Sequence, residues 1–526
     1  MWANFQPLIY IGVLLSAAVY FYLRERDQRA GFAKKSFFVT VGLYLFSFFF
    51  EGGGFLYSLL GVLTPDVAFM VAVILVLNRF APRPKMLYFA IFAVFAGIKL
   101  FFINPSVEYL WNDQPTQEQV PVIEETTRAY PELDQNAEFL MDVKSHTNNA
   151  EIKKLVEKYD LKLTLAFPDI AHPEYTQLDD YYTVNVPDHQ MKNLSKIQDA
   201  LMATGEIDDI EPNEIVQATP VFPSKKPRDP NRRPKYRVND PGVEKMWGFE
   251  AMKAADLFDW LAENEIKPKK KAKIAILDTG VESDHEDISD NYFSVGEKND
   301  YDKLGHGTHC AGIAAAVSNN GKGIASFAPN GDFVEVTSIK VLSDNGYGTQ
   351  KGVLDGILKA ADTKVDVISM SLGGPSNQMR QRAYNQAFEY ARKSGAVTVV
   401  AAGNSNADAT KYCPANSEGV ISVAAIDPDI NRASFSNKVG SLKMGIAAPG
   451  VNIFSTFPNG EYKFLNGTSM ATPYVSGLVG VMKSLNPDLD TEQVYEILNK
   501  TGVDTKDVEN TGKLIQAAAA VKAAAE

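Results

Sequence analysis

Hydrophobic residues are distributed unevenly along the 526-residue chain. Residues 1–103 are strongly apolar, whereas the chain after Asn104 mixes apolar and polar positions as soluble domains do. The apolar runs are Leu8–Leu23, Phe37–Phe50, Val67–Leu77 and Met86–Ile103. A helix that spans a bilayer needs about 20 apolar residues, so the two middle runs must borrow from the mostly apolar residues 52–64. We expect about four membrane-spanning helices in 1–103, or three if the middle pair forms one broken element.

Basic residues between these runs indicate an orientation. The segments 24–35 and 79–85 are rich in Lys and Arg, which favours the cytoplasmic side of the membrane. Four spans place both basic segments inside and both chain ends outside. Three spans would place the two basic segments on opposite faces of the membrane. The pattern therefore predicts a multi-pass protein of the plasma (inner) membrane. Its polar bulk would lie outside the cytoplasm, in the periplasm or at the cell exterior.

Hydrophobic periodicity changes twice between 137 and 219. Alternation predicts strands at "AEFLMDVK", "LKLTLAF" and "YYTVNVP", and a last edge strand at "IDDIEPNEIVQA". Helical spacing predicts one helix that starts near Asn149 and a second that ends at Gly205. The order βαββαβ predicts a small ferredoxin-like sandwich. We interpret 104–136 as a linker, and the proline-rich, basic segment 220–239 as an extended linker that proteases can reach.

Strands and helices alternate from 240 to 526, which predicts a doubly wound, mostly parallel α/β sheet. Ligands bind such sheets at the carboxyl ends of the strands. Asp278 ends the apolar strand "KIAILD", His306 opens an alanine-rich helix in "GHGTHCAG", and Ser469 lies in the first helical turn of "GTSMATP". We therefore expect all three side chains at one edge of the sheet.

These residue types suit nucleophilic acyl transfer. His306 would take the proton of Ser469, while Asp278 would orient the imidazole and stabilise its cation. Asn404, which follows the strand "VTVVAAG", would donate its side-chain amide to the oxyanion. Each residue alone fits an ordinary turn or cap. The occurrence of all four beside glycines and small residues favours a catalytic site.

The motifs resemble those of the subtilisin-like serine proteases, or subtilases. The matches are "DTG" with "DHEDI", "GHGTH", "AAGN" and "GTSMATP", in the chain order Asp, His, Ser. The resemblance covers about 240–521 and implies a serine endopeptidase that acts on polypeptide substrates. It assigns Ser371, Leu372 and Gly373 to the substrate backbone, and Ala401, Ala402 and Gly403 to the pocket for the residue before the scissile bond. No acidic cluster accompanies these residues, so we expect a broad or apolar preference.

The loop "SNNGKGIASFAP" resembles a calcium-binding loop of the family. The resemblance assigns the oxygen shell to the side chains of Asp287 and Asn320 and to the backbone carbonyls of Lys322 and Ile324. Gly321 and Lys322 depart from the common pattern, so a plain loop without metal is the alternative. The chemistry itself requires no cofactor.

The position and the βαββαβ order of 137–219 resemble the subtilase propeptide, which assists folding and blocks the cleft with its C-terminal tail. We therefore expect a zymogen that is cut between Ala218 and Val238. The alternative function is a catalytically silent membrane sensor or scaffold that binds peptides with the same fold.

Composition adds two points. The net charge of −12, without a basic patch interleaved with aromatic residues, argues against nucleic acid as a partner. The two cysteines, Cys310 and Cys413, favour buried thiols over a single disulfide. The expected partners are thus polypeptide substrates, the chain's own propeptide domain and the lipid bilayer, and nothing in the sequence indicates an oligomeric state.

Overall fold

The computed structural model describes residues 133–526 apart from 145–149, 219–221, 224–236 and 377–380. The predicted membrane helices and almost all of the predicted linker before the small domain lie outside these residues. Among the helices of the described part, none has the length and apolar character needed to cross a bilayer.

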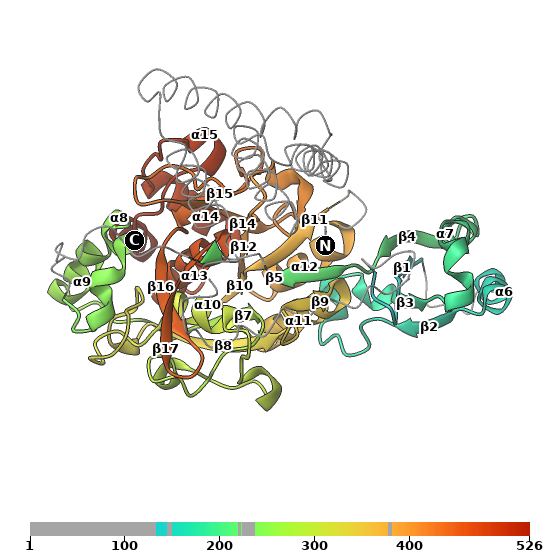
Figure 1. The fold of residues 1–526 in the computed structure, drawn as a ribbon, viewed down its shortest axis with the longest axis horizontal. Helices are drawn as coiled ribbons and strands as arrows, with labels where there is room; N and C mark the ends of the chain where they lie inside the picture. The colour runs from blue at the N-terminus through green and yellow to red at the C-terminus, as the bar shows by residue number, and fades with distance from the viewer. Residues whose placement is uncertain (1–132, 145–149, 219–221, 224–236, 377–380) are drawn as a thin grey trace, which may run out of the picture. The chain divides into compact units, whose positions relative to one another are not determined.

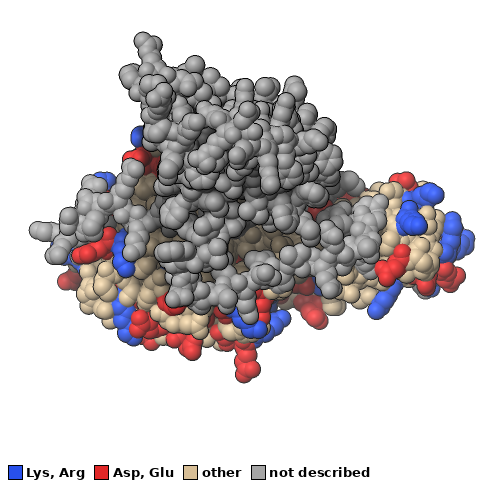
Figure 2. Space-filling view, in the orientation of Figure 1, with Lys and Arg blue, Asp and Glu red and all other residues tan. Residues whose placement is uncertain are grey.

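The first described unit, 133–218, contains a four-stranded antiparallel sheet with the strand order β2-β3-β1-β4 (Figure 1). Its main elements are β1 (Phe139–Val143), α6 (Ala150–Tyr159), β2 (Lys162–Leu165), β3 (Tyr181–Asn185), α7 (Leu194–Met202) and β4 (Ile207–Pro212). This is the βαββαβ order that the periodicity predicts. Lys/Arg and Asp/Glu side chains are intermixed on the visible surface of α6 and α7, as on helix faces that meet water (Figure 2).

Both faces of β1 are buried because they meet different partners. Phe139 and Met141 pack in the domain's own core, with the helix residues Ile197 and Leu201. Leu140 points the other way and belongs to a core cluster of the larger domain. Because side chains alternate along the strand, one face of the small sheet packs against its own helices and the other face packs against the larger domain.

The predicted last strand is two strands in the structure. β4 stays in the small sheet, and β5 (Ile215–Ala218) joins a sheet with strands of the larger domain. Pro212, which has no N–H, is the last residue of β4 to pair with β1. The prediction of one continuous strand was wrong at this point, because the chain changes partners after the proline.

The larger domain is built on a six-stranded parallel sheet with the order β15-β14-β12-β10-β7-β8. Its strands are β7 (Ala272–Asp278), β8 (Val334–Lys340), β10 (Val367–Met370), β12 (Val397–Ala401), β14 (Val420–Ile426) and β15 (Gly445–Pro449). The helices are α8 (Trp247–Ala251), α9 (Ala254–Glu263), α10 (His306–Ala315), α11 (Gln350–Asp362), α12 (Gln381–Lys393), α13 (Thr468–Leu485), α14 (Thr491–Thr501), α15 (Val508–Thr511) and α16 (Ala517–Ala525). The prediction of a parallel α/β sheet is confirmed.

Helices cover both faces of this sheet. Ile274 and Ile276 of β7 share a core cluster with α10 and α13, whereas Ala275 and Leu277 share another with α11 and α12. A strand that is buried on both faces needs a nearly continuous apolar sequence, as β7 has. The two layers of helices leave the carboxyl edge of the sheet for the site.

Two small sheets border that edge. One has the order β13-β11-β5-β9, and the other has the order β16-β17-β6. Their remaining strands are β6 (Phe222–Pro223), β9 (Tyr347–Thr349), β11 (Leu372–Pro375), β13 (Tyr412–Cys413), β16 (Ile453–Phe457) and β17 (Glu461–Asn466).

Candidate active site

Asp278 and His306 form a buried pair at the carboxyl edge of the sheet. Oδ1 of Asp278 lies 2.7 Å from Nδ1 of His306, and the residues are 0% and 4% exposed. A carboxylate is an acceptor, so Nδ1 donates and Nε2 is left as the basic nitrogen. Nε2 is buried, and no hydrogen bond from the described residues reaches it. The pair has the orientation that a general base requires.

The environment of His306 favours its cation. Burial lowers the pKa of His306, but the charge and hydrogen bond of Asp278 and the charge of Asp302 more than offset this and raise it. His309, three residues later in α10, has no such carboxylate and is bonded through Nε2 to the carbonyl of Lys463 at 3.0 Å. Burial lowers the pKa of His309 to about 3. Only the first histidine is therefore poised to carry a proton.

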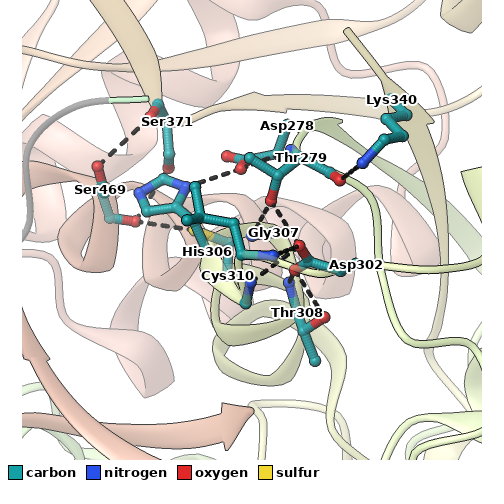
Figure 3. A network of polar contacts seen from close by, with 12 residues as sticks. Asp278, Thr279, Asp302, His306, Gly307, Thr308, Cys310, Lys340, Ser371 and Ser469 are labelled. Atoms are coloured by element: carbon teal, nitrogen blue, oxygen red, sulfur yellow. Dashed lines mark hydrogen bonds and ion pairs between the residues drawn. The ribbon is translucent and has the colours of Figure 1, made fainter. Parts of the chain in front are cut away.

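Ser469 lies in the first turn of α13, beside this pair. Its carbonyl oxygen accepts from Oγ of Ser371 at 2.9 Å and from Sγ of Cys310 at 3.4 Å. That sulfur lies within 4.8 Å of the Asp278 carboxylate and the His306 ring nitrogen. Figure 3 shows the imidazole between the serine and the aspartate. The structure thus brings the three predicted side chains together.

The hydroxyl of Ser469 makes a long contact, 3.4 Å, to the carbonyl oxygen of Ser371. It is not hydrogen-bonded to Nε2 of His306. Hydrogen bonds between nucleophile and base are often long or misaligned before substrate binds.

Asn404 follows β12 and is oriented by a residue that the sequence did not single out. Its Oδ1 accepts two hydrogen bonds from Thr468, one from the N–H and one from the hydroxyl, both 2.9 Å long. Because these donors occupy the oxygen, the NH₂ group of the amide is turned away from Thr468. The position of Thr468, directly before Ser469, was the available signal for this role.

The residues predicted for substrate binding lie together. Leu372 and Gly373 of β11 pair antiparallel with Ala218 and Gln217 of β5, and Ser371 precedes that strand. On its other edge β5 pairs with β9. The tail of the small domain therefore runs between two strands of the larger domain, bonded to the predicted substrate strand.

A small pocket opens beside this tail. Residues that line it include Ala401, Ala402, Gly403, Asn404, Tyr412 and Gln217. Gly403 has φ +99°, and a Cβ there would lie 2.5 Å from Nδ2 of Asn437. Glycine is therefore required at this wall. Tyr412 is a lining residue that the sequence analysis missed, since it lies in a different segment from the other walls.

Asp287 and Asn320, predicted as calcium ligands, are neighbours. Oδ1 of Asp287 accepts from Nδ2 of Asn320 at 2.8 Å, and its Oδ2 accepts from the N–H of Ile324 at 2.7 Å. Oδ1 of Asn320 accepts from the N–H of Lys322 at 2.7 Å. Burial raises the pKa of Asp287 to about 7. In this arrangement the side-chain oxygens accept from N–H groups of their own loop, and the calcium site stays a prediction.

The two cysteines are buried and unbridged. Burial raises the pKa of Cys310 well above its ordinary value, so it is a thiol and not a thiolate.

Comparisons with known proteins agree with this geometry. Residues 269–516 match the model of the Subtilase family. Subtilisin DY from Bacillus licheniformis is 41% identical over 247 residues, which cover 46% of this chain and 87% of the relative. Thermitase from Thermoactinomyces vulgaris is 42% identical over 255 residues, 47% of this chain and 86% of the relative.

One solved structure extends the likeness in fold. The crystal structure of fervidolysin from Fervidobacterium pennivorans, a keratinolytic enzyme related to subtilisin, has a TM-score of 0.59 at 24% identity. The match covers 74% of this chain and 61% of that chain.

Proposed function

Because the chain belongs to the subtilase family of serine endopeptidases, we propose that Asp278, His306 and Ser469 form its catalytic triad. The observation that carries this proposal is the buried 2.7 Å contact between Asp278 and His306, with Nε2 left as the base. The substrates are polypeptides, as for the family.

The residues perform acyl transfer as follows. Nε2 of His306 takes the hydroxyl proton as Oγ of Ser469 bonds to the peptide carbonyl carbon, and Asp278 stabilises the imidazolium. The oxyanion accepts from the amide of Asn404 and from the backbone N–H of Ser469 at the positive end of α13. The imidazolium then protonates the leaving amine as the C–N bond breaks. Water, deprotonated by the same nitrogen, releases the acyl group.

The substrate binds as an extended strand between β11 and β9. The support is the path of β5, which forms both ladders and donates the N–H of Ala218 to the carbonyl of Gly346 at 2.8 Å. Main-chain pairing of this kind gives affinity without strict sequence selection. Ala401, Ala402 and Gly403 form one wall of the pocket for the residue before the scissile bond, and the preference is broad or apolar.

The enzyme is made as a zymogen whose small domain blocks the cleft. Besides β5, the contact between the domains includes the buried side-chain carboxyl group of Glu211. It accepts from the N–H of Ala383 at 2.8 Å and from Nε2 of Gln350 at 2.9 Å. Asp142 pairs with Arg382 at 2.8 Å. The strand and these polar contacts together support a domain that inhibits by occupying the substrate position.

The chain is cut between Ala218 and Phe222. Residues on both sides of this segment are held at the site, since β5 pairs with β11 and β6 pairs with Leu465 and Asn466 of β17. β17 leads directly into α13 and Ser469. This range is narrower than the range 218–238 expected from the sequence.

Residues 1–103 anchor the protein in the plasma membrane as about four helices, and the peptidase domain works outside the cytoplasm. The support is the length of the apolar runs and the distribution of Lys and Arg. Cleavage after Ala218 parts the peptidase domain covalently from this anchor.

The test of the triad is covalent labelling with a fluorophosphonate probe, together with hydrolysis of casein. The full chain should be labelled and active, whereas Ser469→Ala should be neither. Ser476→Ala, also on α13, is the matched control, because its hydroxyl bonds to Ser369 and Thr472 away from the site. Labelling of Ser469→Ala would overturn the assignment. An unlabelled and inactive wild type would favour the silent scaffold.

A further inference from the structure

Asp302 is a buried carboxylate that the mechanism above does not use. It is 6% exposed and lies in the loop before α10, four residues ahead of His306. Five donor groups converge on its two oxygens. A buried charge is tolerated only with partners of this kind, and each partner would lose its acceptor if the carboxylate were removed.

The donors divide between the two oxygens. Oδ1 of Asp302 accepts from the hydroxyl of Thr279 at 2.9 Å and from the N–H groups of Leu304 and Gly305 at 3.1 and 2.9 Å. Oδ2 accepts from the N–H of Thr308 at 2.9 Å and from its hydroxyl at 2.8 Å. Asp302 therefore caps the start of α10 from outside the helix.

These partners belong to the two segments that carry the Asp278–His306 pair. Thr279 follows Asp278 directly, and Thr308 lies two residues after His306 in the first turn of α10. The carboxylate of Asp302 thus bridges the turn after β7 and the start of α10 (Figure 3).

The two bridged segments are in close contact at Gly307. The N–H of Gly307 donates to Oγ1 of Thr279 at 3.1 Å. A Cβ on Gly307 would lie 2.1 Å from the carbonyl oxygen of Gly280 and 3.1 Å from Cβ of Asp278. A small shift of either segment would therefore change the geometry of the pair.

We propose that Asp302 is a positioning residue for the reaction. Its buried carboxylate holds the turn of Asp278 and the helix of His306 at hydrogen-bonding distance, and its charge favours the imidazolium that forms during proton transfer. The inference rests on the proposed triad and adds a fourth side chain to it.

The charges around the imidazole support the second part of this role. Burial lowers the pKa of His306, and the charges of Asp278 and Asp302 both raise it. The two titratable neighbours of His306 within α10 are neutral, because burial lowers the pKa of His309 to about 3 and raises that of the Cys310 thiol. The ammonium of Lys340 lies on the other side of the turn and donates to the carbonyl of Thr279. Among the described residues that shift this imidazole, the two carboxylates supply the charge.

Three variants of the full chain separate the parts of the role. Asp302→Asn removes the charge and keeps one acceptor oxygen. Thr279→Val removes the hydroxyl that donates to Asp302 and accepts from the N–H of Gly307, and it keeps the charge. Asp300→Asn is the matched control, since this carboxylate in the same loop accepts from Tyr292 and Ser294 and not from α10.

The readout is hydrolysis of a chromogenic peptide as a function of pH, with active sites counted by the fluorophosphonate probe. Asp302→Asn should lower kcat on the order of 10-fold with little change in KM, because misplaced catalytic groups lower turnover. It should also move the acid limb of kcat/KM to lower pH, because the imidazolium loses a neighbouring anion. Thr279→Val should lower kcat without moving the acid limb, and Asp300→Asn should match the wild type.

An Asp302→Asn enzyme with wild-type kcat and an unmoved acid limb overturns the inference, as does one that loses thermal stability alone. If that variant does not fold, Thr279→Val decides, and an unchanged kcat there overturns the bridge. Ser469→Ala measured alongside keeps the two proposals apart. Turnover by Ser469→Ala would overturn the triad itself, whereas an inactive Ser469→Ala beside a normal Asp302→Asn overturns only the positioning role.

Discussion

Gln217 of the small domain is paired in antiparallel register with Gly373 of the larger domain. If substrates bind along β11 as proposed, the tail of the small domain occupies their position. The wild-type chain should be cut between Ala218 and Phe222, and Ser469→Ala should stay intact because its own nucleophile is missing. N-terminal sequencing and intact-mass spectrometry of both proteins measure this. A cut Ser469→Ala chain would assign the cleavage to another protease.

The contact between the domains should weaken as the pH rises. Burial raises the pKa of Glu211 to about 8, although hydrogen bonds from Ala383 and Gln350 act in the opposite direction. The docked carboxyl thus binds its proton more tightly than an exposed one, whose pKa is about 4.3. Docking is therefore favoured at low pH and loses up to about 10-fold in its equilibrium constant per pH unit between these two values.

Burial also raises the pKa of Asp142, to about 6. This shift likewise favours docking of the small domain at low pH. Binding of a fluorescent peptide to the uncut Ser469→Ala chain, measured from about pH 5 to about pH 9, should increase with pH. Adding Glu211→Gln, which mimics the protonated carboxyl, should flatten this dependence. An equally steep rise in the double variant would contradict the assignment to Glu211.

The contributions of Asn404 and Thr468 to kcat should depend on each other. Loss of an oxyanion donor lowers kcat about 100- to 1000-fold, so Asn404→Ala should leave a weak enzyme. Thr468→Val removes one of the two hydrogen bonds that orient the amide and should lower kcat about 10-fold at unchanged KM, a cost of about 1.4 kcal/mol. Thr468→Val also removes the acceptor of the Gly403 N–H, so in the Asn404→Ala background the second change should add less than it does alone. Additive losses in this double-mutant cycle would show that Thr468 acts independently of the amide.

Calcium should have little effect on stability. The oxygens of Asp287 and Asn320 accept from N–H groups of their own loop. A filled cage would stabilise the folded state by about 4 kcal/mol at 1,000 times its Kd, and chelation would remove this gain. The Tm of the purified protein should therefore be nearly the same in calcium chloride and in a chelator. A large fall in the chelator would mean that the loop rearranges around the ion.

Sequence patterns predicted the parts of the molecule in which one local rule dominates. The strand before Asp278 is apolar throughout because it is buried on both faces, and the glycines around His306 mark close contacts between chain segments. The sequence patterns did not predict features that depend on contacts between residues far apart in the chain. In the sequence, Asp302 looks like any loop residue. Its role depends on the hydrogen bonds from Thr279 and Thr308, which only the folded structure reveals.

The change of partner after Pro212 has the same cause. The periodicity of β4 and β5 describes two extended segments, but only the neighbouring strands β1, β9 and β11 decide to which sheet each belongs.

The four-stranded sheet β13-β11-β5-β9 is complete only while the tail lies in it. When β5 departs, β9 and β11 become two facing strand edges with unsatisfied backbone groups. An extended polypeptide can pair with both edges through its backbone, as β5 does. The vacated enzyme would therefore bind unfolded polypeptides and other copies of its own chain alike, so the docked tail also protects the molecules around it.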